Sequence, residues 1–262
     1  MNRIEEKLEE LKQKNEKAFI TYMTAGLPDM EGTKAIIKAQ EIAGTDIIEL
    51  GIPFSDPVAD GPVIQAASIE SIQKGTNLTK VLDMVEELRE DCQIPIIFMM
   101  YYNTILHYGI EKFVHQCTKV GVDGLIIPDL PYEEQGEINE FLENENTPIL
   151  IQLVSPVSKI RIPMLLEHAR GFVYCVSTMG VTGQAVGFYK DVVNYLDDVK
   201  QKSKIPVMMG FGIQTASDVE AIREYIDGAI VGSKFITVMK ESGYDIDVIK
   251  DYCKSFKTEL NQ

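Results

Sequence analysis

The sequence predicts a (β/α)8 TIM barrel with an extra N-terminal helix, and three observations support this fold class. Eight short apolar runs alternate with longer amphipathic segments along the 262 residues, and a barrel of eight β-then-α units needs about 250. The apolar runs are nearly continuous, as strands covered on both faces must be. No linker, charge block or low-complexity segment divides the chain, so residues 1–262 are expected to form a single domain.

The predicted strands are short and end in turn residues. They span residues 18–23, 46–50, 95–101, 124–129, 148–154, 171–177, 206–211 and 228–233. Three of them open with proline, which is tolerated at the first residue of a strand. A doubly wound sheet is the alternative, but it usually has fewer strands and a glycine-rich first βα turn. Here that turn is "TAGLPD", which does not match GxGxxG.

The predicted helices have apolar residues repeating at helical spacing. The first, within residues 4–15, repeats Ile4, Leu8 and Leu11 and is expected to cover the bottom of the barrel. Two later segments each place four apolar residues on one face. In residues 30–44 these are Ile36, Ile37, Ala39 and Ile42, and in residues 109–121 they are Ile110, Phe113, Val114 and Cys117.

Charge and hydropathy exclude several classes of partner. The net charge is −15 and no arginine-rich run is present, so nucleic acid is not expected to bind. No stretch reaches the about 18 apolar residues of a membrane span, and the charged start "MNRIEEKLEELKQKN" is unlike a signal peptide. The sequence therefore predicts a cytoplasmic protein that does not bind membranes.

The cysteines and histidines form no ligand motif. The four cysteines lack CxxC spacing and are interpreted as buried thiols of a reducing compartment. The three histidines, His107, His115 and His168, are interpreted as surface or structural residues. No metal site is expected.

The stretch "ELGIPFSDPVADGP" (49–62) carries the strongest functional signal. Glu49 stands at the end of an apolar strand, where a carboxylate is costly unless it is paired or protonated. The alternative to a functional role for Glu49 is a structural one, in which its carboxylate contacts a helix N-terminus or pairs with a lysine. Asp60 is either a site residue or the N-cap of a helix that begins at Pro62. Asp56 and Asp129 are interpreted as turn or cap aspartates.

Glycines form a second cluster at the ends of the last two strands. "GFGI" (210–213) and "VGS" (231–233) are each expected to open a helix and to present backbone N–H groups to one anion. This is the usual phosphate position of such barrels. Helix dipoles and amides, instead of cationic side chains, would then hold phosphate in an acidic chain. The alternative is that these are turn glycines without a ligand.

These motifs, together with "MTAGLPD" (23–29) and "STMGVTG" (177–183), resemble those of the tryptophan synthase alpha chain family over nearly the full length. The resemblance implies an indole-3-glycerol-phosphate lyase that releases indole and glyceraldehyde 3-phosphate by retro-aldol cleavage. It also implies no cofactor in this chain, and a beta-chain partner that carries pyridoxal phosphate in an alpha2beta2 heterotetramer.

The resemblance also implies site residues. Glu49 and Asp60 would be the catalytic pair, with Tyr174 near Glu49. The indole ring would face Tyr22, Met99, Tyr101 and Phe211, and the phosphate would lie near Gly183, Gly212, Gly232 and Ser233, with Thr182 also in the substrate site.

The chemistry explains why two different carboxyl groups are useful. Carbon 3 of the indole ring must gain a proton before the carbon–carbon bond breaks, and the side-chain hydroxyl must then lose one. Burial among Ile47, Ile48 and Leu50 should raise the pKa of Glu49 toward working pH, which suits both transfers. Asp60, on a more polar loop, can stay ionised and accept from the ring N–H.

The sequence departs from the family pattern in three places. Leu27 and Thr178 stand where the family often has aspartate and, in some members, arginine. The stretch after "GVTG" has no charged residue before Lys190. Two other functions therefore stay open. One is another enzyme of this scaffold, such as a phosphosugar isomerase or epimerase. The other is a subunit that mainly binds and activates its partner.

Overall fold

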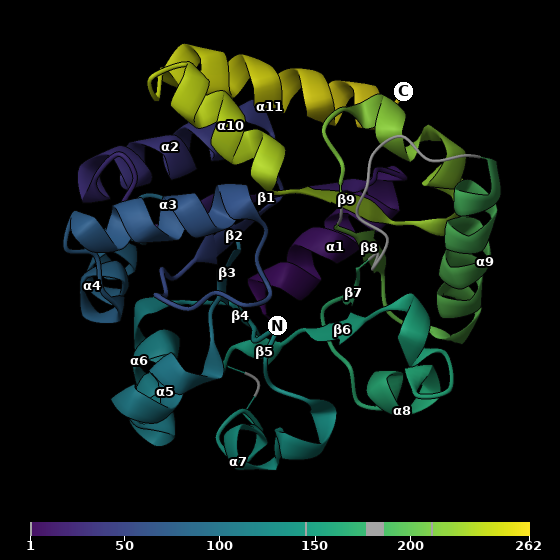
Figure 1. The fold of residues 1–262 in the computed structure, drawn as a ribbon, viewed down its shortest axis with the longest axis horizontal. Helices are drawn as coiled ribbons and strands as arrows, with labels where there is room; N and C mark the ends of the chain where they lie inside the picture. The colour runs from purple at the N-terminus through teal and green to yellow at the C-terminus, as the bar shows by residue number, and fades with distance from the viewer. Residues whose placement is uncertain (1, 145, 177–185, 211) are drawn as a thin grey trace.

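A computed structural model describes residues 2–144, 146–176, 186–210 and 212–262. Within them, nine parallel strands form one sheet in the order β5-β4-β3-β2-β1-β9-β8-β7-β6 (Figure 1). The strands are β1 (Ala18–Thr24), β2 (Ile47–Gly51), β3 (Ile96–Met99), β4 (Gly124–Ile126), β5 (Ile149–Leu150), β6 (Gln152–Val154), β7 (Val173–Cys175), β8 (Val207–Met209) and β9 (Gly228–Val231).

The sheet closes on itself through one interrupted strand. β5 and β6 lie at the two ends of the sheet order, yet only Ile151 separates them in the chain. The Ile151 N–H still donates to the carbonyl of Leu125 in β4, at 2.9 Å. The two pieces are therefore one barrel strand that bends at Ile151. This gives eight barrel positions, confirms the (β/α)8 fold, and shows that the doubly wound alternative is wrong.

Helices surround the strands (Figure 1). They are α1 (Arg3–Lys14), α2 (Met30–Ala43), α3 (Pro62–Gln73), α4 (Leu78–Leu88), α5 (Tyr102–Tyr108), α6 (Ile110–Val120), α7 (Gly136–Asn139), α8 (Ile162–Leu166), α9 (Val186–Lys202), α10 (Ser233–Glu241) and α11 (Ile246–Leu260). Short 3-10 helices are η1 (Tyr132–Glu134), η2 (Pro156–Ser158) and η3 (Ala216–Tyr225). η3 takes the place of the α-helix expected between β8 and β9.

Helix α1 closes the bottom of the barrel, as its apolar spacing predicted. Ile4, Leu8 and Leu11 are buried and pack with side chains that fill the barrel, among them Ile97 and Phe172. Figure 1 shows α1 behind the strands. Only the opposite face, at the carboxyl ends of the strands, is therefore open to a ligand that enters the barrel.

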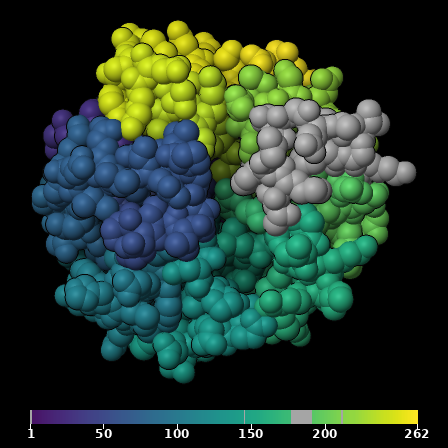
Figure 2. Space-filling model, viewed as in Figure 1, coloured from purple at the N-terminus to yellow at the C-terminus, as the bar shows by residue number. Residues whose placement is uncertain are grey.

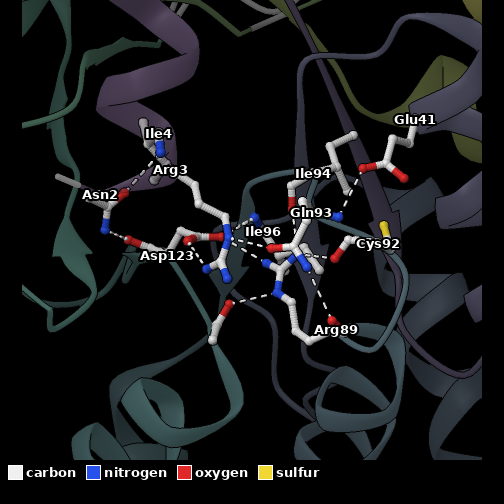
Figure 3. A network of polar contacts seen from close by, with 11 residues as sticks. Asn2, Arg3, Ile4, Glu41, Arg89, Cys92, Gln93, Ile94, Ile96 and Asp123 are labelled. Atoms are coloured by element: carbon white, nitrogen blue, oxygen red, sulfur yellow. Dashed lines mark hydrogen bonds and ion pairs between the residues drawn. The ribbon is translucent and has the colours of Figure 1, made fainter.

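Asp123 fastens α1 to the start of β4 (Figure 3). Its carboxylate accepts hydrogen bonds from Arg3 at 2.9 Å, from Arg89 at 2.8 Å and from the Ile96 N–H at 2.8 Å. The side chain of Asn2 caps α1 and also donates to the Asp123 carbonyl. Removal of one partner of such a buried pair typically costs about 3–5 kcal/mol, so this network stabilises the closed bottom.

One predicted buried residue is exposed. Ile36, Ile37 and Ala39 of α2 are buried, but Ile42 is 77% exposed. At 100° per residue, Ile42 points away from the other three, and Gln40 occupies the inward position. Gln40 is completely buried and accepts a hydrogen bond from Thr21 of β1. The prediction for Ile42 was wrong because a satisfied polar side chain takes that face.

Candidate active site

A cavity of about 750 Å³ lies at the carboxyl ends of the strands, and Figure 2 shows this face hollowed near its centre. Its volume is in the usual range for small-molecule sites, about 300–1,000 Å³. The cavity brings together eight residues predicted from the sequence, which are Tyr22, Glu49, Asp60, Met99, Tyr174, Gly212, Gly232 and Ser233.

Glu49 lies in β2, between Tyr22 of β1 and Ile97 of β3 in the sheet register. It is 1% exposed, and no group within the described residues hydrogen-bonds to either carboxyl oxygen. Burial, and to a smaller degree the nearby charge of Asp60, raises the pKa of Glu49 to about 8. Glu49 therefore holds a proton at neutral pH. No described protein group accepts a hydrogen bond from it, so the proton is available to a ligand.

Asp60 is held by a tyrosine from the neighbouring strand end. Tyr101 donates its hydroxyl hydrogen to Asp60 Oδ2 at 3.1 Å and accepts from the Ala59 N–H at 2.9 Å. Burial raises the pKa of Asp60 to about 6, and the hydrogen bond from Tyr101 opposes that rise. Asp60 is thus mostly ionised at neutral pH, where Glu49 is mostly protonated.

The helix-cap interpretation of Asp60 is wrong. The N-cap of α3 is Gly61, and no side chain makes the cap hydrogen bond. Asp129 does act at a helix start, since its carboxylate accepts from the Tyr102 N–H of α5 at 2.9 Å. Asp56 is exposed and accepts from the Ser55 hydroxyl, as expected for a turn residue.

Two glycines make room for the tyrosines beside Glu49. A Cβ at Gly51 would lie 2.1 Å from the Tyr22 hydroxyl oxygen, and a Cβ at Gly210 would lie 2.5 Å from that of Tyr174. Burial raises the pKa of both tyrosines, so both hydroxyls stay neutral. Gly210 was predicted to belong to a phosphate loop, and no role was predicted for Gly51.

The phosphate end of the cavity is built differently from the prediction. Gly212 has φ +71° and open space around its Cβ position, and Gly232 begins α10 without a side-chain cap. By contrast, η3 has its own capping box, in which Asp218 accepts from the Gln214 and Thr215 N–H groups. Asp218 thus caps the start of η3, whereas no side chain among the described residues caps the start of α10.

Lys234, in the first turn of α10, also lines the cavity. It is the only Lys or Arg among the described lining residues, whereas no cationic side chain was predicted at the phosphate. Its signal in the sequence was its place directly after "VGS". Tyr101 was predicted to face the indole ring. It does not line the cavity, and its ring stacks on Phe54 at 5.0 Å.

Three predicted site residues, Thr182, Gly183 and Phe211, lie outside the described residues.

In the part of the chain that the structure describes, no group of three or more His, Cys, Asp or Glu residues could hold a metal ion. No helix among the described residues is long and apolar enough to cross a membrane. Cys92, Cys117, Cys175 and Cys253 are free and buried, as expected.

A family model described as "Tryptophan synthase alpha chain" matches residues 8–261. The chain belongs to the tryptophan synthase alpha chain family. An alpha chain from Lachnospira eligens is 60% identical, with both chains fully covered. An alpha chain from Thermoanaerobacter sp. strain X514 is 45% identical, over 100% of this chain and 99% of the relative.

Solved structures agree with this family. The tryptophan synthase subunit alpha of Legionella pneumophila superposes with a TM-score of 0.89 at 33% identity, over 99% of this chain and 98% of that one. A chain of Mycobacterium tuberculosis tryptophan synthase superposes with a TM-score of 0.89 at 32% identity, over 100% and 99%. Membership of the alpha-chain family favours the lyase over the phosphosugar isomerase or epimerase considered from the sequence.

Proposed function

We propose that the chain catalyses the alpha reaction of tryptophan synthase, the retro-aldol cleavage of indole-3-glycerol phosphate to indole and glyceraldehyde 3-phosphate. One observation carries the chemistry. Two carboxyl groups face one cavity, and their pKa values of about 8 and about 6 place opposite protonation states there at neutral pH. An acid and a base are thus available together.

In the proposed mechanism, Glu49 gives its proton to carbon 3 of the indole ring. The ring loses its aromaticity and its N–H becomes acidic. The Asp60 carboxylate then accepts the N–H proton. The Glu49 carboxylate then takes the proton of the side-chain hydroxyl next to the ring. The carbon–carbon bond breaks as the aldehyde forms, its electron pair restores the indole ring, and the ring nitrogen regains the proton held by Asp60. Glu49 ends protonated, ready for another cycle.

The walls of the cavity suit the two ends of this substrate. Tyr22, Met99 and Tyr174 would contact the indole ring near the carboxyl groups. The phosphate would bind at Gly212 and the start of α10, where N–H groups, the helix dipole and Lys234 favour an anion.

We propose a tryptophan synthase beta chain as partner, in an alpha2beta2 complex with pyridoxal phosphate only in the beta chain. Indole is small and neutral and would diffuse away unless it were passed on directly. The proposed docking surface is the face around the cavity mouth, where Val58, Val157 and Ile160 are 84%, 83% and 95% exposed. Val58 belongs to the same loop as Asp60, so docking would couple association to catalysis. The alpha reaction would take place in the cytoplasm.

The decisive experiment is a lyase assay of the purified chain with indole-3-glycerol phosphate, alone and with added cognate beta chain. Turnover by the isolated chain that rises on titration supports both proposals. No turnover alone, with activation of the beta chain intact, would support the partner-activating alternative. A flat titration and no complex on a sizing column would overturn the partner proposal.

Asp56→Ala tests the coupling through the loop. Asp56 is exposed on the proposed docking surface and does not line the cavity. The variant should reduce activation by the beta chain more than it reduces basal lyase turnover. Equal reduction of both rates would count against coupling through this loop.

A further inference from the structure

A second cavity, of about 430 Å³, lies at the bottom of the barrel and shares no lining residue with the candidate active site. It forms where the ends of α1 and α9 meet the segments that lead into β1, β8 and β9. The proposed lyase reaction assigns no role to it.

The charge of this cavity is opposite to that of the whole protein. Five cationic side chains line it, against two acidic ones, Glu16 and Asp227, in a chain of net charge −15. The cationic residues are Lys12, Lys17, Lys200, Lys204 and Arg223. They come from several separate segments, so the fold, and not a run of basic sequence, concentrates them.

Only part of this positive charge is used within the protein. Lys17 donates to the Ile226 carbonyl at 2.7 Å, and Lys200 binds both carboxylate oxygens of Asp227. Lys204 and Arg223 make no ion pair or side-chain hydrogen bond to any described residue. These two cations are left to attract an anion from solution.

The cations also repel one another. Burial lowers the pKa of Lys17, the charge of Asp227 opposes that fall, and the charges of Lys200 and Arg223 add to it. An anion in the cavity would relieve this repulsion. Binding would therefore be favoured both by the two unpaired cations and by the relief of repulsion among the cationic side chains.

The floor of the cavity is apolar. Ile205 and Pro206 line it and are partly exposed, and the other apolar lining residues, Leu8, Leu11 and Met208, are buried. A phosphate or sulfate ion alone would leave this floor uncovered. A ligand with an apolar body and one anionic group matches both the floor and the cationic rim.

We propose that this bottom cavity binds a small organic anion with an aromatic or aliphatic body, such as an arylcarboxylate. The proposal does not rest on the lyase function, because the two cavities have no residue in common.

The test uses the full chain, 2-naphthoate as probe and 2-naphthamide as its uncharged counterpart. Titrations followed by amide NMR should show 2-naphthoate shifting the signals of Leu8, Asn15 and Met208. The naphthamide should bind there at least tenfold more weakly. Binding should weaken with added salt, because the rim charges are exposed or half-buried.

Variants separate this site from the active site. Lys204→Gln and Arg223→Gln should each weaken binding at the bottom about fivefold or more and leave lyase turnover unchanged. Lys112→Gln, an exposed residue of α6, is the matched control and should change neither. Equal affinity for the acid and the amide, unchanged binding in both cavity variants, or shifts confined to Gly212 and Gly232 would each overturn the proposal.

Discussion

Glu49→Gln should abolish the lyase reaction and, at the same time, stabilise the fold above pH 5. The substitution is nearly isosteric and removes the ionisable proton. Loss of a general acid–base typically lowers turnover about 10²–10⁴-fold. The stability effect has a different origin, since the folded protein resists ionisation of this buried carboxyl group.

The magnitude follows from the pKa of Glu49. Burial raises it from 4.5 to about 8 in the folded state. A carboxyl group with a raised folded pKa contributes no penalty below pH 4.5. The free energy of unfolding then falls as the pH rises from 4.5 to the folded pKa of about 8. The full penalty is about 5 kcal/mol above pH 8, and about 3 kcal/mol at pH 7. The Glu49→Gln variant carries no such penalty, although the introduced amide still needs partners.

The assay is urea unfolding of wild type and Glu49→Gln at pH 5, 6, 7, 8 and 9. The difference in unfolding free energy should grow in favour of the variant up to pH 8 and then level off. Glu241→Gln, at the exposed end of α10, is the control and should give a constant difference. A constant difference for Glu49→Gln, or turnover above about a tenth of wild type, would refute this account of Glu49.

Four further substitutions test the remaining parts of the site. Asp60→Asn should lower turnover at least about 10²-fold, because an amide cannot accept the ring proton; near-normal activity would leave Asp60 without a catalytic role. Tyr101→Phe should raise the pKa of Asp60 above about 6, and an acid limb of the rate profile that stays in place would contradict this. Gly212→Val should weaken the binding of glyceraldehyde 3-phosphate but not of indole, as measured by calorimetry, because φ is +71° there. Equal losses of affinity for the two ligands would indicate misfolding. Lys234→Gln should raise KM about threefold to tenfold with little change in kcat, whereas Lys254→Gln, exposed on α11, should change neither.

The barrel itself was predictable because its physical requirements repeat along the chain. Each buried strand needs a continuous apolar run, and each covering helix needs an apolar face, so the pattern shows both. The break at Ile151 was not predictable, because it depends on how the strand bends as the sheet closes. Gln40 was missed because its partner, Thr21, lies on another element.

The catalytic carboxyl groups were easier to predict than their surroundings. Glu49 stands out because a carboxylate in an apolar strand is expensive. The roles of Gly51 and Gly210 depend on where two tyrosine rings point, which no local pattern records. The position of Tyr101 likewise depends on the loop that carries Asp60.

Closure of the barrel bottom by α1 has a consequence for synthesis on the ribosome. The apolar face of α1 is made early, but Asp123 and Phe172, which hold and cover it, follow more than a hundred residues later. At about 5–20 residues per second, α1 waits roughly 8–30 s for Phe172. During that time the apolar face of α1 is only partly covered, by partners made earlier such as Ile20, Ile47 and Ile97. The nascent chain therefore exposes apolar side chains of α1, to which chaperones and other nascent chains can bind.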